Sequence, residues 1–374
     1  MKAGSAKAGS DDIVASIDMG TNSTRLLVVD TSTGEVLDRL MTITRLGEGV
    51  DATGELAEEA IDRTLAVLRS YKGIMDSRGV SKCRAVATSA ARDASNRDRL
   101  FNGVRDILGV QPELLSGSEE GKLSFIGATS DLHHLPQSSP CNFPLDMPEG
   151  VEYGYSYAGK GYSSNKSGDY ASPAGSNSSS GSLYGASPGG ADEEGLLVVD
   201  IGGGSTEIIF GNPAYPDLAR AVSLDIGCVR LTERCLHNDP PTQAEIAMAR
   251  QVANESLASA RAAIGYGRYG ECLIGLAGTV STIGSLTIQL DVYDREKIHH
   301  LAIQRSVIGE WADTLSGETA AARLQHPGMS KGREDIIAGG VIILDEAMSV
   351  FGASWCLISE SDILDGLVSS LSRK

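Results

Sequence analysis

Two seven-residue segments of the chain repeat the same pattern of Asp, Gly, Ser and Thr. Residues 18–24 read Asp-Met-Gly-Thr-Asn-Ser-Thr and residues 200–206 read Asp-Ile-Gly-Gly-Gly-Ser-Thr, so the shared residue types recur at one constant offset. Each segment ends one short apolar run and leads into another, which predicts a strand, a glycine-containing turn and a returning strand. An ordered repeat of this kind indicates a duplicated domain, with two equivalent turns facing each other across a cleft.

The apolar patterns around the two turns predict an α/β fold. The first half shows three strands and then alternating helix and strand, at residues 13–18, 25–30, 35–45, 56–68 (helix), 84–87, 97–108 (helix), 112–115 and 119–128 (helix). The second half restarts this order, at residues 196–200, 206–210, 219–224, 244–264 (helix) and 273–276. The matching order supports the duplication.

The length of 374 residues predicts two domains. We expect domain I at residues 11–132, with a last helix returning to it at about 357–374, and domain II at residues 195–356. Residues 136–194 are rich in Gly, Ser, Pro and Asn, hold six of the eleven tyrosines and show no apolar periodicity. We interpret this stretch as a disordered insertion, either a tolerated surface loop or a segment whose tyrosines dock a partner.

The acidic composition limits the partners. The formal net charge is −17, so we expect no binding to nucleic acid or to an anionic membrane surface. No apolar run approaches the roughly 18 residues of a membrane helix. Residues 1–10 lack the apolar core of a signal peptide, so we expect a cytoplasmic protein.

The cysteines and histidines show no disulfide or metal spacing. The six cysteines are scattered without a CxxC pair, and we expect reduced, mostly buried thiols. Four of the six histidines form adjacent pairs, His133 with His134 and His299 with His300. Neighbouring residues do not share a helix face, so we interpret both pairs as surface residues.

The two turns carry residue types that suit phosphate and a divalent cation. Successive backbone N–H groups in a glycine-rich turn form a concave site for phosphate oxygens. Asp18 and Asp200 end buried strands and would point into the cleft, and Glu207 lies two residues beyond the second serine. These carboxylates would repel phosphate unless a cation such as Mg²⁺ lay between them. The alternative is two ordinary hairpins in which Asp is a turn former.

Five segments in order along the chain resemble the motifs of the exopolyphosphatase/guanosine pentaphosphate phosphatase family, in particular its short, two-domain, actinobacterial-like members. They are residues 17–27, 87–94, 115–121, 199–207 and 275–279. The resemblance implies an actin-like (ribonuclease-H-like) fold with an active site in the interdomain cleft. It also implies Mg²⁺- or Mn²⁺-dependent release of a terminal phosphate from inorganic polyphosphate or from pppGpp.

The resemblance further implies roles for individual residues. It implies that Glu120 is the general base that activates the attacking water. Helix geometry agrees with a single base here, because neighbouring helix positions point about 100° apart and only one of Glu119 and Glu120 can face the cleft. The implied metal ligands are Asp18, Asp200 and Glu207. The implied phosphate-binding residues are Gly20, Thr21, Asn22, Ser23, Arg92, Gly203, Gly204, Ser205 and Thr206.

Two departures from the family pattern bear on the substrate. Residues 361–366 lack an arginine that many members carry. We also expect a protein without the additional C-terminal helical domains of the long members. Together with the net charge, this leads us to expect short polyphosphate chains as substrates. The alternatives are a pppGpp 5′-phosphohydrolase at the same site, an actin-like kinase, or a non-catalytic phosphate or nucleotide sensor. Members of the family are commonly dimeric, which leaves a homodimer open.

Overall fold

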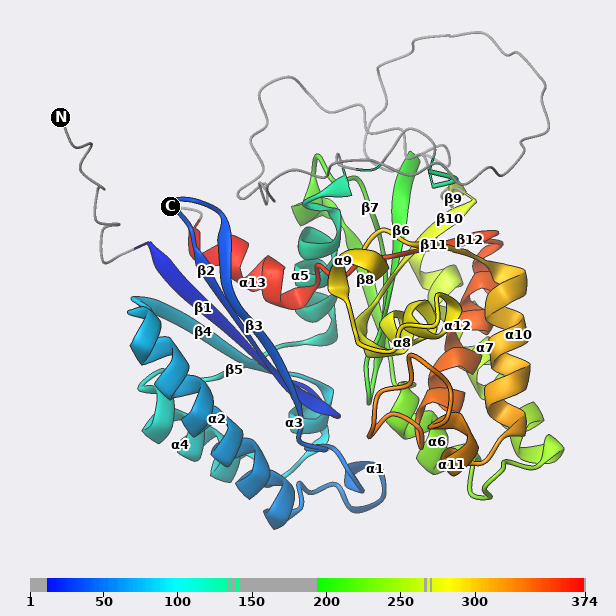
Figure 1. Ribbon diagram of the computed structural model, residues 1–374, viewed down its shortest axis with the longest axis horizontal. Coiled ribbons are helices and arrows are strands. Elements are labelled where there is room, and N and C mark those ends of the chain that lie inside the picture. The colour runs from blue at the N-terminus through cyan, green and yellow to red at the C-terminus, as the bar shows by residue number, and fades with distance from the viewer. Residues whose placement is uncertain are drawn as a thin grey trace, which may run out of the picture.

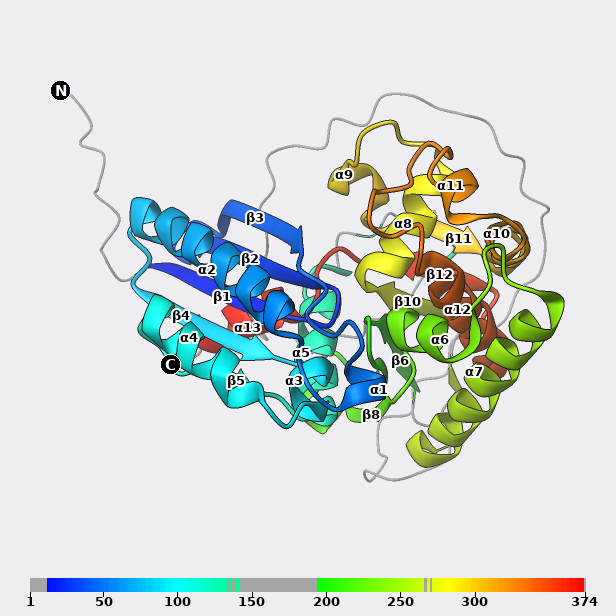
Figure 2. The same cartoon turned by 90° about the horizontal axis from the view of Figure 1, so that it is seen from below.

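The computed structural model describes residues 12–132, 135, 139–141, 194–265, 268–269 and 271–372. These residues form two lobes, each built on one sheet (Figure 1 and Figure 2). Most of the stretch expected as an insertion, residues 136–194, lies outside the described residues, as does the pair His133 and His134.

The first sheet has the strand order β3-β2-β1-β4-β5. The first three strands are antiparallel neighbours, and β4 and β5 continue the sheet in parallel with β1. The strands are β1 (Ile13–Met19), β2 (Ser23–Asp30), β3 (Glu35–Ile43), β4 (Lys82–Ala87) and β5 (Glu113–Leu114).

The second sheet repeats this arrangement, with the order β11-β12-β10-β6-β7-β8 and β9 beside β6. Three antiparallel strands again come first along the chain, and β10 and β12 follow in parallel with β6. The strands are β6 (Glu194–Ile201), β7 (Thr206–Gly211), β8 (Arg220–Leu224), β9 (Arg268–Tyr269), β10 (Cys272–Leu276), β11 (Ala302–Gln304) and β12 (Trp355–Ile358). The predicted duplicated α/β fold of the actin-like type is therefore confirmed.

Helices cover both faces of the first sheet because its central strands alternate between two apolar layers. Ile17 of β1 packs into a cluster with Leu68 of α2 and Leu100 of α4, whereas Val14 packs with Leu364 of α13 on the opposite face. The helices of this part are α1 (Val50–Thr53), α2 (Glu58–Arg78), α3 (Ser89–Asp93), α4 (Arg97–Leu108) and α13 (Ile363–Ser372).

The second sheet is covered in the same way. Val199 of β6 packs with α7 and α12, while Val198 packs with Phe125 of α5 on the other face. The helices of this part are α5 (Gly117–Thr129), the 3₁₀ turn η2 (Pro216–Leu218), α6 (Cys228–Cys235), α7 (Gln243–Ile264), α8 (Ala277–Thr287), α9 (Arg295–Ile298), α10 (Arg305–Gly317), α11 (Ala320–Arg323) and α12 (Ile337–Phe351).

The last helix of each half packs on the sheet of the other half. Helix α5 follows β5 along the chain but lies on the second sheet, and α13 follows β12 but lies on the first (Figure 1). The two helices cross closely, since a Cβ atom on Gly127 of α5 would lie 1.9 Å from the carbonyl oxygen of Asp362. We expected residues 117–129 in domain I, whereas α5 packs on the second sheet. The domain boundaries 11–132 and 195–356 stay a prediction.

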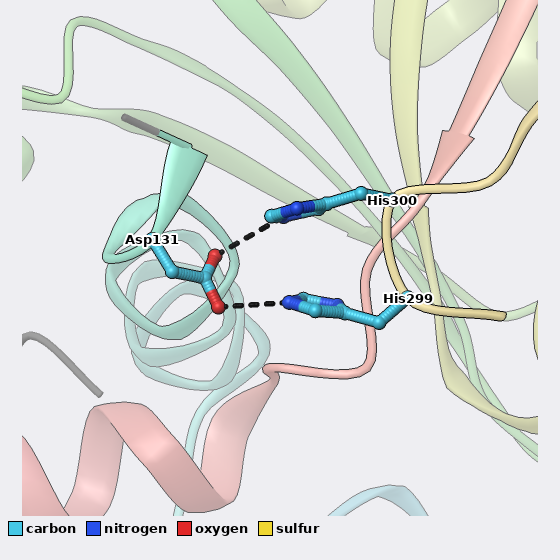
Figure 3. A group of neighbouring side chains, drawn as sticks. All are labelled: Asp131, His299 and His300. Carbon is cyan, nitrogen blue, oxygen red and sulfur yellow. Dashed lines mark hydrogen bonds and ion pairs between the residues drawn. The ribbon is translucent and has the colours of Figure 1, made fainter. Parts of the chain in front are cut away.

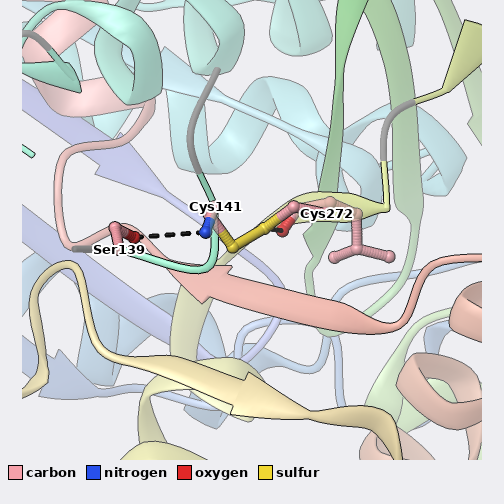
Figure 4. The surroundings of a disulfide bond; sticks show 4 residues. Ser139, Cys141 and Cys272 are labelled. Carbon is pink, nitrogen blue, oxygen red and sulfur yellow. Dashed lines mark hydrogen bonds between the residues drawn. A yellow bond between two sulfur atoms is a disulfide. The ribbon is translucent and has the colours of Figure 1, made fainter. Parts of the chain in front are cut away.

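One cysteine pair departs from the expected reduced thiols. Cys141 and Cys272 form a disulfide that joins residue 141 to the beginning of β10 (Figure 4). Both cysteines are buried, and the other four are free. The prediction was wrong for this pair because the two residues are 131 positions apart, and only the folded chain brings them together.

Within the described ranges, no helix is both long and apolar enough to cross a membrane.

Candidate active site

The two repeated segments form the same turn in the structure. The Gly20 N–H donates to the Ser23 carbonyl oxygen at 3.0 Å, and the Gly202 N–H donates to the Ser205 carbonyl oxygen at 3.0 Å. In each case the preceding strand carries the Asp at its end, and the returning strand begins at or directly after the Ser.

The two turns face each other across the lobes. A Cβ atom on Gly203 would lie 2.8 Å from the Thr21 Cβ, so only glycine lets the second turn approach the first this closely. The Thr21 hydroxyl also shares a 2.8 Å hydrogen bond with the Ser89 hydroxyl at the start of α3. Three segments that are distant in the sequence therefore meet at one place.

A cavity of about 580 Å³ opens between these turns. Nine of the thirteen predicted site residues line it: Asp18, Gly20, Thr21, Asn22, Ser23, Glu120, Asp200, Gly203 and Ser205. The other four are Arg92, Gly204, Thr206 and Glu207, which lie beside the cavity rather than in its lining.

Thr206 is the predicted phosphate-binding residue with least access to the cavity. Its hydroxyl donates to the Ile226 carbonyl oxygen at 2.6 Å, and the residue is fully buried. The side chain therefore joins β7 to the segment before α6 rather than facing a ligand, and the backbone of Thr206 is paired with β6 and β8.

The structure separates the two adjacent glutamates at the start of α5. The Glu119 carboxylate accepts hydrogen bonds from the Ser116 N–H and hydroxyl, which completes a capping box at the helix N-terminus. Glu120 instead turns into the cavity, with 12% of its side chain exposed. This matches the expectation that only one of the two faces the cleft.

Glu120 is held by Arg92. An Arg92 guanidinium N–H donates to the Glu120 carboxylate at 2.6 Å and to the Leu115 carbonyl oxygen at 3.0 Å. Burial raises the pKa of Glu120 to about 7, although Arg92 lowers it. A carboxyl group with a pKa near neutrality suits a general base, because its basic form is both populated and strong enough to accept a proton.

Asp200 and Glu207 lie next to each other across the β6–β7 pair. The Asp200 carboxylate accepts from the Ser124 hydroxyl at 2.7 Å, and the Glu207 carboxylate accepts from the Ser223 hydroxyl at 2.7 Å. Burial raises the pKa of Asp200 to about 6 and raises that of Glu207 well above its ordinary value, with the charge of Glu120 adding to the second shift. The charges of Glu120 and Asp200 both raise the pKa of Glu207, so the three carboxyl groups form one interacting cluster.

The first repeat differs from the second at one position. Asp18 lies opposite Arg25 in β2, just as Asp200 lies opposite Glu207 in β7. Arg25 donates to the Asp18 Oδ2 atom at 2.7 and 3.0 Å and also pairs with Asp362. Asp18 is therefore already neutralised on one oxygen, while the Asp200 side carries uncompensated charge.

The predicted metal ligands Asp18, Asp200 and Glu207 all supply carboxylate oxygens. The Oδ1 atom of Asp18 is buried and lacks a hydrogen-bond partner within the described part of the chain, although among the described residues these three carboxylates do not bring one oxygen each within 4.8 Å of one another. Oxygen donors of this kind are what Mg²⁺ and Mn²⁺ take in proteins.

Three residues that contact the predicted carboxylates or their partners were missed from the sequence: Arg25, Ser124 and Asp362. The positions of Arg25 and Ser124 in the sequence could have indicated their place in the site. Ser124 lies one helical turn after Glu120 and so shares its face, and Arg25 occupies the position in the first repeat that Glu207 has in the second. Asp362 lies at the start of α13 and had no comparable signal.

A second group of ligand-type side chains lies outside this cavity. Asp131, His299 and His300 bring one nitrogen or oxygen atom each within 4.8 Å of one another, a spacing that can hold a metal ion (Figure 3). The interpretation of His299 and His300 as surface residues was wrong. They lie in a turn after α9, where His300 has φ +64° and the two rings stack at 3.8 Å between centroids.

The hydrogen bonds of His299 account for this group without a metal. Its Nδ1 atom accepts from the Glu360 N–H at 3.0 Å, so the ring proton is on Nε2, which donates to Asp131 at 2.9 Å. A metal ion on Nε2 would need that proton on Nδ1, where it would oppose the Glu360 N–H. Asp131 and His299 therefore form a hydrogen-bonded pair.

The paired turns and the repeated sheet define a two-lobed α/β protein with phosphate-type turns at the lobe junction. The chain belongs to the Ppx/GppA phosphatase family, which matches residues 27–137 and 182–374. It is 35% identical over 373 residues to exopolyphosphatase 2 of Mycobacterium tuberculosis, covering 96% of this chain and 98% of that protein.

Solved structures show the same fold. A crystal structure of an exopolyphosphatase-like protein has a TM-score of 0.72 at 31% identity and covers 95% of this chain and 97% of the other. The Ppx/GppA family member of Aquifex aeolicus has a TM-score of 0.68 at 25% identity and covers 96% of both chains.

Proposed function

We propose that this chain is an exopolyphosphatase, which hydrolyses the terminal phosphoanhydride bond of inorganic polyphosphate. The observation that carries the proposal is the position of Glu120, a carboxyl group with a raised pKa at the edge of a cavity into which two phosphate-type turns open. The 35% identical exopolyphosphatase 2 supports the same substrate class.

In the proposed reaction, the terminal phosphoryl group lies between the two turns. Backbone N–H groups of the turns and the Ser23 and Ser205 hydroxyls bind its oxygens. Glu120 accepts a proton from the attacking water, and the shortened polyphosphate leaves with the bridging oxygen. Phosphoryl transfer of this kind needs mainly positioning and charge neutralisation, so the turns and Arg92 supply most of the rate enhancement.

Asp200, Glu207 and the unpartnered oxygen of Asp18 would hold a divalent cation, with Mg²⁺ or Mn²⁺ as the proposed ion. Such an ion neutralises charge on the phosphate oxygens. Burial raises the pKa of Asp18 and Arg25 opposes this shift, and because Arg25 bonds only the Oδ2 atom, the Oδ1 atom of Asp18 stays available.

A second substrate fits the same cavity. Beyond the turns the cavity extends to Gly278, Tyr293 and Glu360, a wall with an aromatic ring and hydrogen-bonding groups. A volume of about 580 Å³ has room for a nucleoside as well as a short phosphate chain. Cleavage of the 5′ terminal phosphate of pppGpp is therefore the second candidate. Short polyphosphate remains our proposed preference over long chains.

The test is phosphate release from short polyphosphate, long polyphosphate and pppGpp with added Mg²⁺. We expect release from short polyphosphate, and a loss of about 10²-fold or more in Glu120→Gln, because general-base help contributes about 10²- to 10⁴-fold. Glu119→Gln is the matched control, since it changes the neighbouring carboxylate outside the cavity. Phosphate release from pppGpp alone would show that pppGpp, and not polyphosphate, is the substrate. Phosphate release from none of the three compounds would exclude the proposed hydrolase activity.

A further inference from the structure

The buried carboxylate of Asp131 joins three segments that are distant in the sequence. Asp131 lies two residues beyond the end of α5 and is 6% exposed. Its Oδ2 atom accepts from the His299 Nε2 at 2.9 Å (Figure 3). The same atom accepts from the Ser361 hydroxyl at 2.9 Å. A buried carboxylate with two donors on one oxygen holds those donors firmly.

His299 extends this link to the next residue of the chain. Its Nδ1 atom accepts from the Glu360 N–H at 3.0 Å. Glu360 and Ser361 are therefore both fixed to the end of α5, one through the ring of His299 and one directly through Asp131. The ring is held by hydrogen bonds on both nitrogens, which defines its orientation.

The segment anchored in this way is a wall of the candidate active site. Ser359, Glu360 and Asp362 line the cavity. The Asp362 carboxylate pairs with Arg25, which in turn holds Asp18. A displacement of this wall would therefore reach the Asp18 carboxylate through two ion pairs.

We infer that Asp131 and His299 are positioning residues that hold the wall of residues 359–362 against the end of α5. Helix α5 carries Glu120 at its first turn and Asp131 beyond its last, so one rigid element sets the distance between the general base and the Asp18 side of the cavity. The catalytic part of this inference rests on the proposed function, whereas the anchoring of the wall does not.

Three substitutions of His299 separate its two hydrogen bonds. His299→Asn keeps an acceptor near the position of Nδ1, His299→Gln keeps a donor that reaches Asp131, and His299→Ala removes both. His300→Asn is the matched control, because Asn tolerates the positive φ of this position and the change removes the ring stacking on His299 and a 3.4 Å contact with Asp131 but neither hydrogen bond of His299. Thermal melting of each variant shows that it is folded.

The first measurement needs no substrate. Hydrogen exchange by mass spectrometry reports the protection of the Glu360 amide and of the peptide containing residues 359–362. We expect fast exchange in His299→Ala and His299→Gln, and protection close to wild type in His299→Asn and His300→Asn. Unchanged protection in His299→Ala would overturn the inference, even if the wild type released no phosphate.

The second measurement is the rate of phosphate release. We expect kcat to fall on the order of 10- to 100-fold in His299→Ala with a smaller change in KM, because a misplaced catalytic group costs about this much. Asn and Gln should recover part of the loss, and His300→Asn should stay within about twofold. Complete loss of phosphate release in all three His299 variants, together with stoichiometric zinc in the purified wild type, would overturn the inference and show that Asp131, His299 and His300 form a metal site.

Discussion

The guanidinium of Arg92 donates to the carboxylate of Glu120 at 2.6 Å, although the two residues belong to different lobes. Arg92 lies in α3, which follows a strand of the first sheet, whereas Glu120 lies in α5, which packs on the second sheet. The pair therefore exists only when the lobes are placed as they are here. It ties the ionisation of Glu120, the proposed general base, to the placement of the two lobes.

Removal of Arg92 should shift the pH dependence of phosphate release. Arg92 lowers the pKa of Glu120, which burial raises to about 7, so Arg92→Gln raises that pKa further. Because the base must be ionised, the acid limb of log(kcat/KM) should move to higher pH, and kcat should fall as well. Arg84→Gln is the control, since Arg84 pairs with Glu113 away from the cavity. An acid limb that stays in place in Arg92→Gln would show that Arg92 does not act on Glu120.

The metal-free protein should lose stability as the pH rises from about 5 to 8. The pKa values of Glu120 and Asp200 in the folded protein, about 7 and about 6, lie above the ordinary values of unfolded chains. The folded state then binds more protons than the unfolded state in this range, so the free energy of unfolding falls with rising pH.

The measurement is the melting temperature in a chelator across this pH range, repeated with Mg²⁺. We expect Mg²⁺ to stabilise the protein most at pH 8, where the carboxylates are ionised. Asp200→Asn should flatten the metal-free curve. A melting temperature that rises with pH in the chelator would contradict the expectation.

The crossing of α5 and α13 should not tolerate a methyl group. Gly127→Ala would place a Cβ atom 1.9 Å from the Asp362 carbonyl oxygen, and we expect a loss of about 2–4 kcal/mol in the free energy of unfolding. Gly73→Ala in α2 is the matched control, because nothing lies within 4 Å of the new Cβ. That change should raise the free energy of unfolding by about 0.5–1 kcal/mol. Urea unfolding compares the two variants directly. Equal unfolding midpoints for Gly127→Ala and Gly73→Ala would refute the close crossing of α5 and α13.

Reduction of the Cys141–Cys272 disulfide should destabilise the protein. We expect a loss of about 2–5 kcal/mol in the free energy of unfolding when a reductant is added, because the bond constrains the unfolded chain. Cys141→Ser should show the same loss and no longer respond to reductant, while Cys83→Ser should respond as the wild type does. Peptide mapping without reductant should find Cys141 and Cys272 linked. Free thiols at both positions would show that the disulfide does not form.

Local patterns were sufficient to predict nine of the twelve described strands and the two turns, whereas β9, β11 and β12 were not predicted. Each turn is encoded by seven neighbouring residues, and the same order of strands follows each of them, so the duplication was visible without a structure. The sequence also indicated that only one of Glu119 and Glu120 faces the cavity, because neighbouring positions of a helix point in different directions.

Features set by packing between distant segments could not be predicted. The apolar face of α5 indicates that the helix is buried but does not say which sheet it covers. The argument against shared contacts of His299 and His300 assumed a helix, whereas a positive φ at His300 turns both rings toward Asp131. Asp362 reaches the site only because the chain returns to the first lobe at its end.

The position of the disulfide has a practical consequence. Cys141, the last described residue before position 194, is bonded to the first residue of β10, and the described chain resumes at the first residue of β6. The candidate active site lies at the opposite ends of these two parallel strands, where Leu276 is paired with Asp200. At about 3.3 Å per residue, the length of β10 puts more than 10 Å between the two ends. A fluorescent label or an affinity tag attached directly after Cys141 or directly before Glu194 therefore joins the protein more than 10 Å from the candidate active site, and we expect it to leave phosphate release at the wild-type rate.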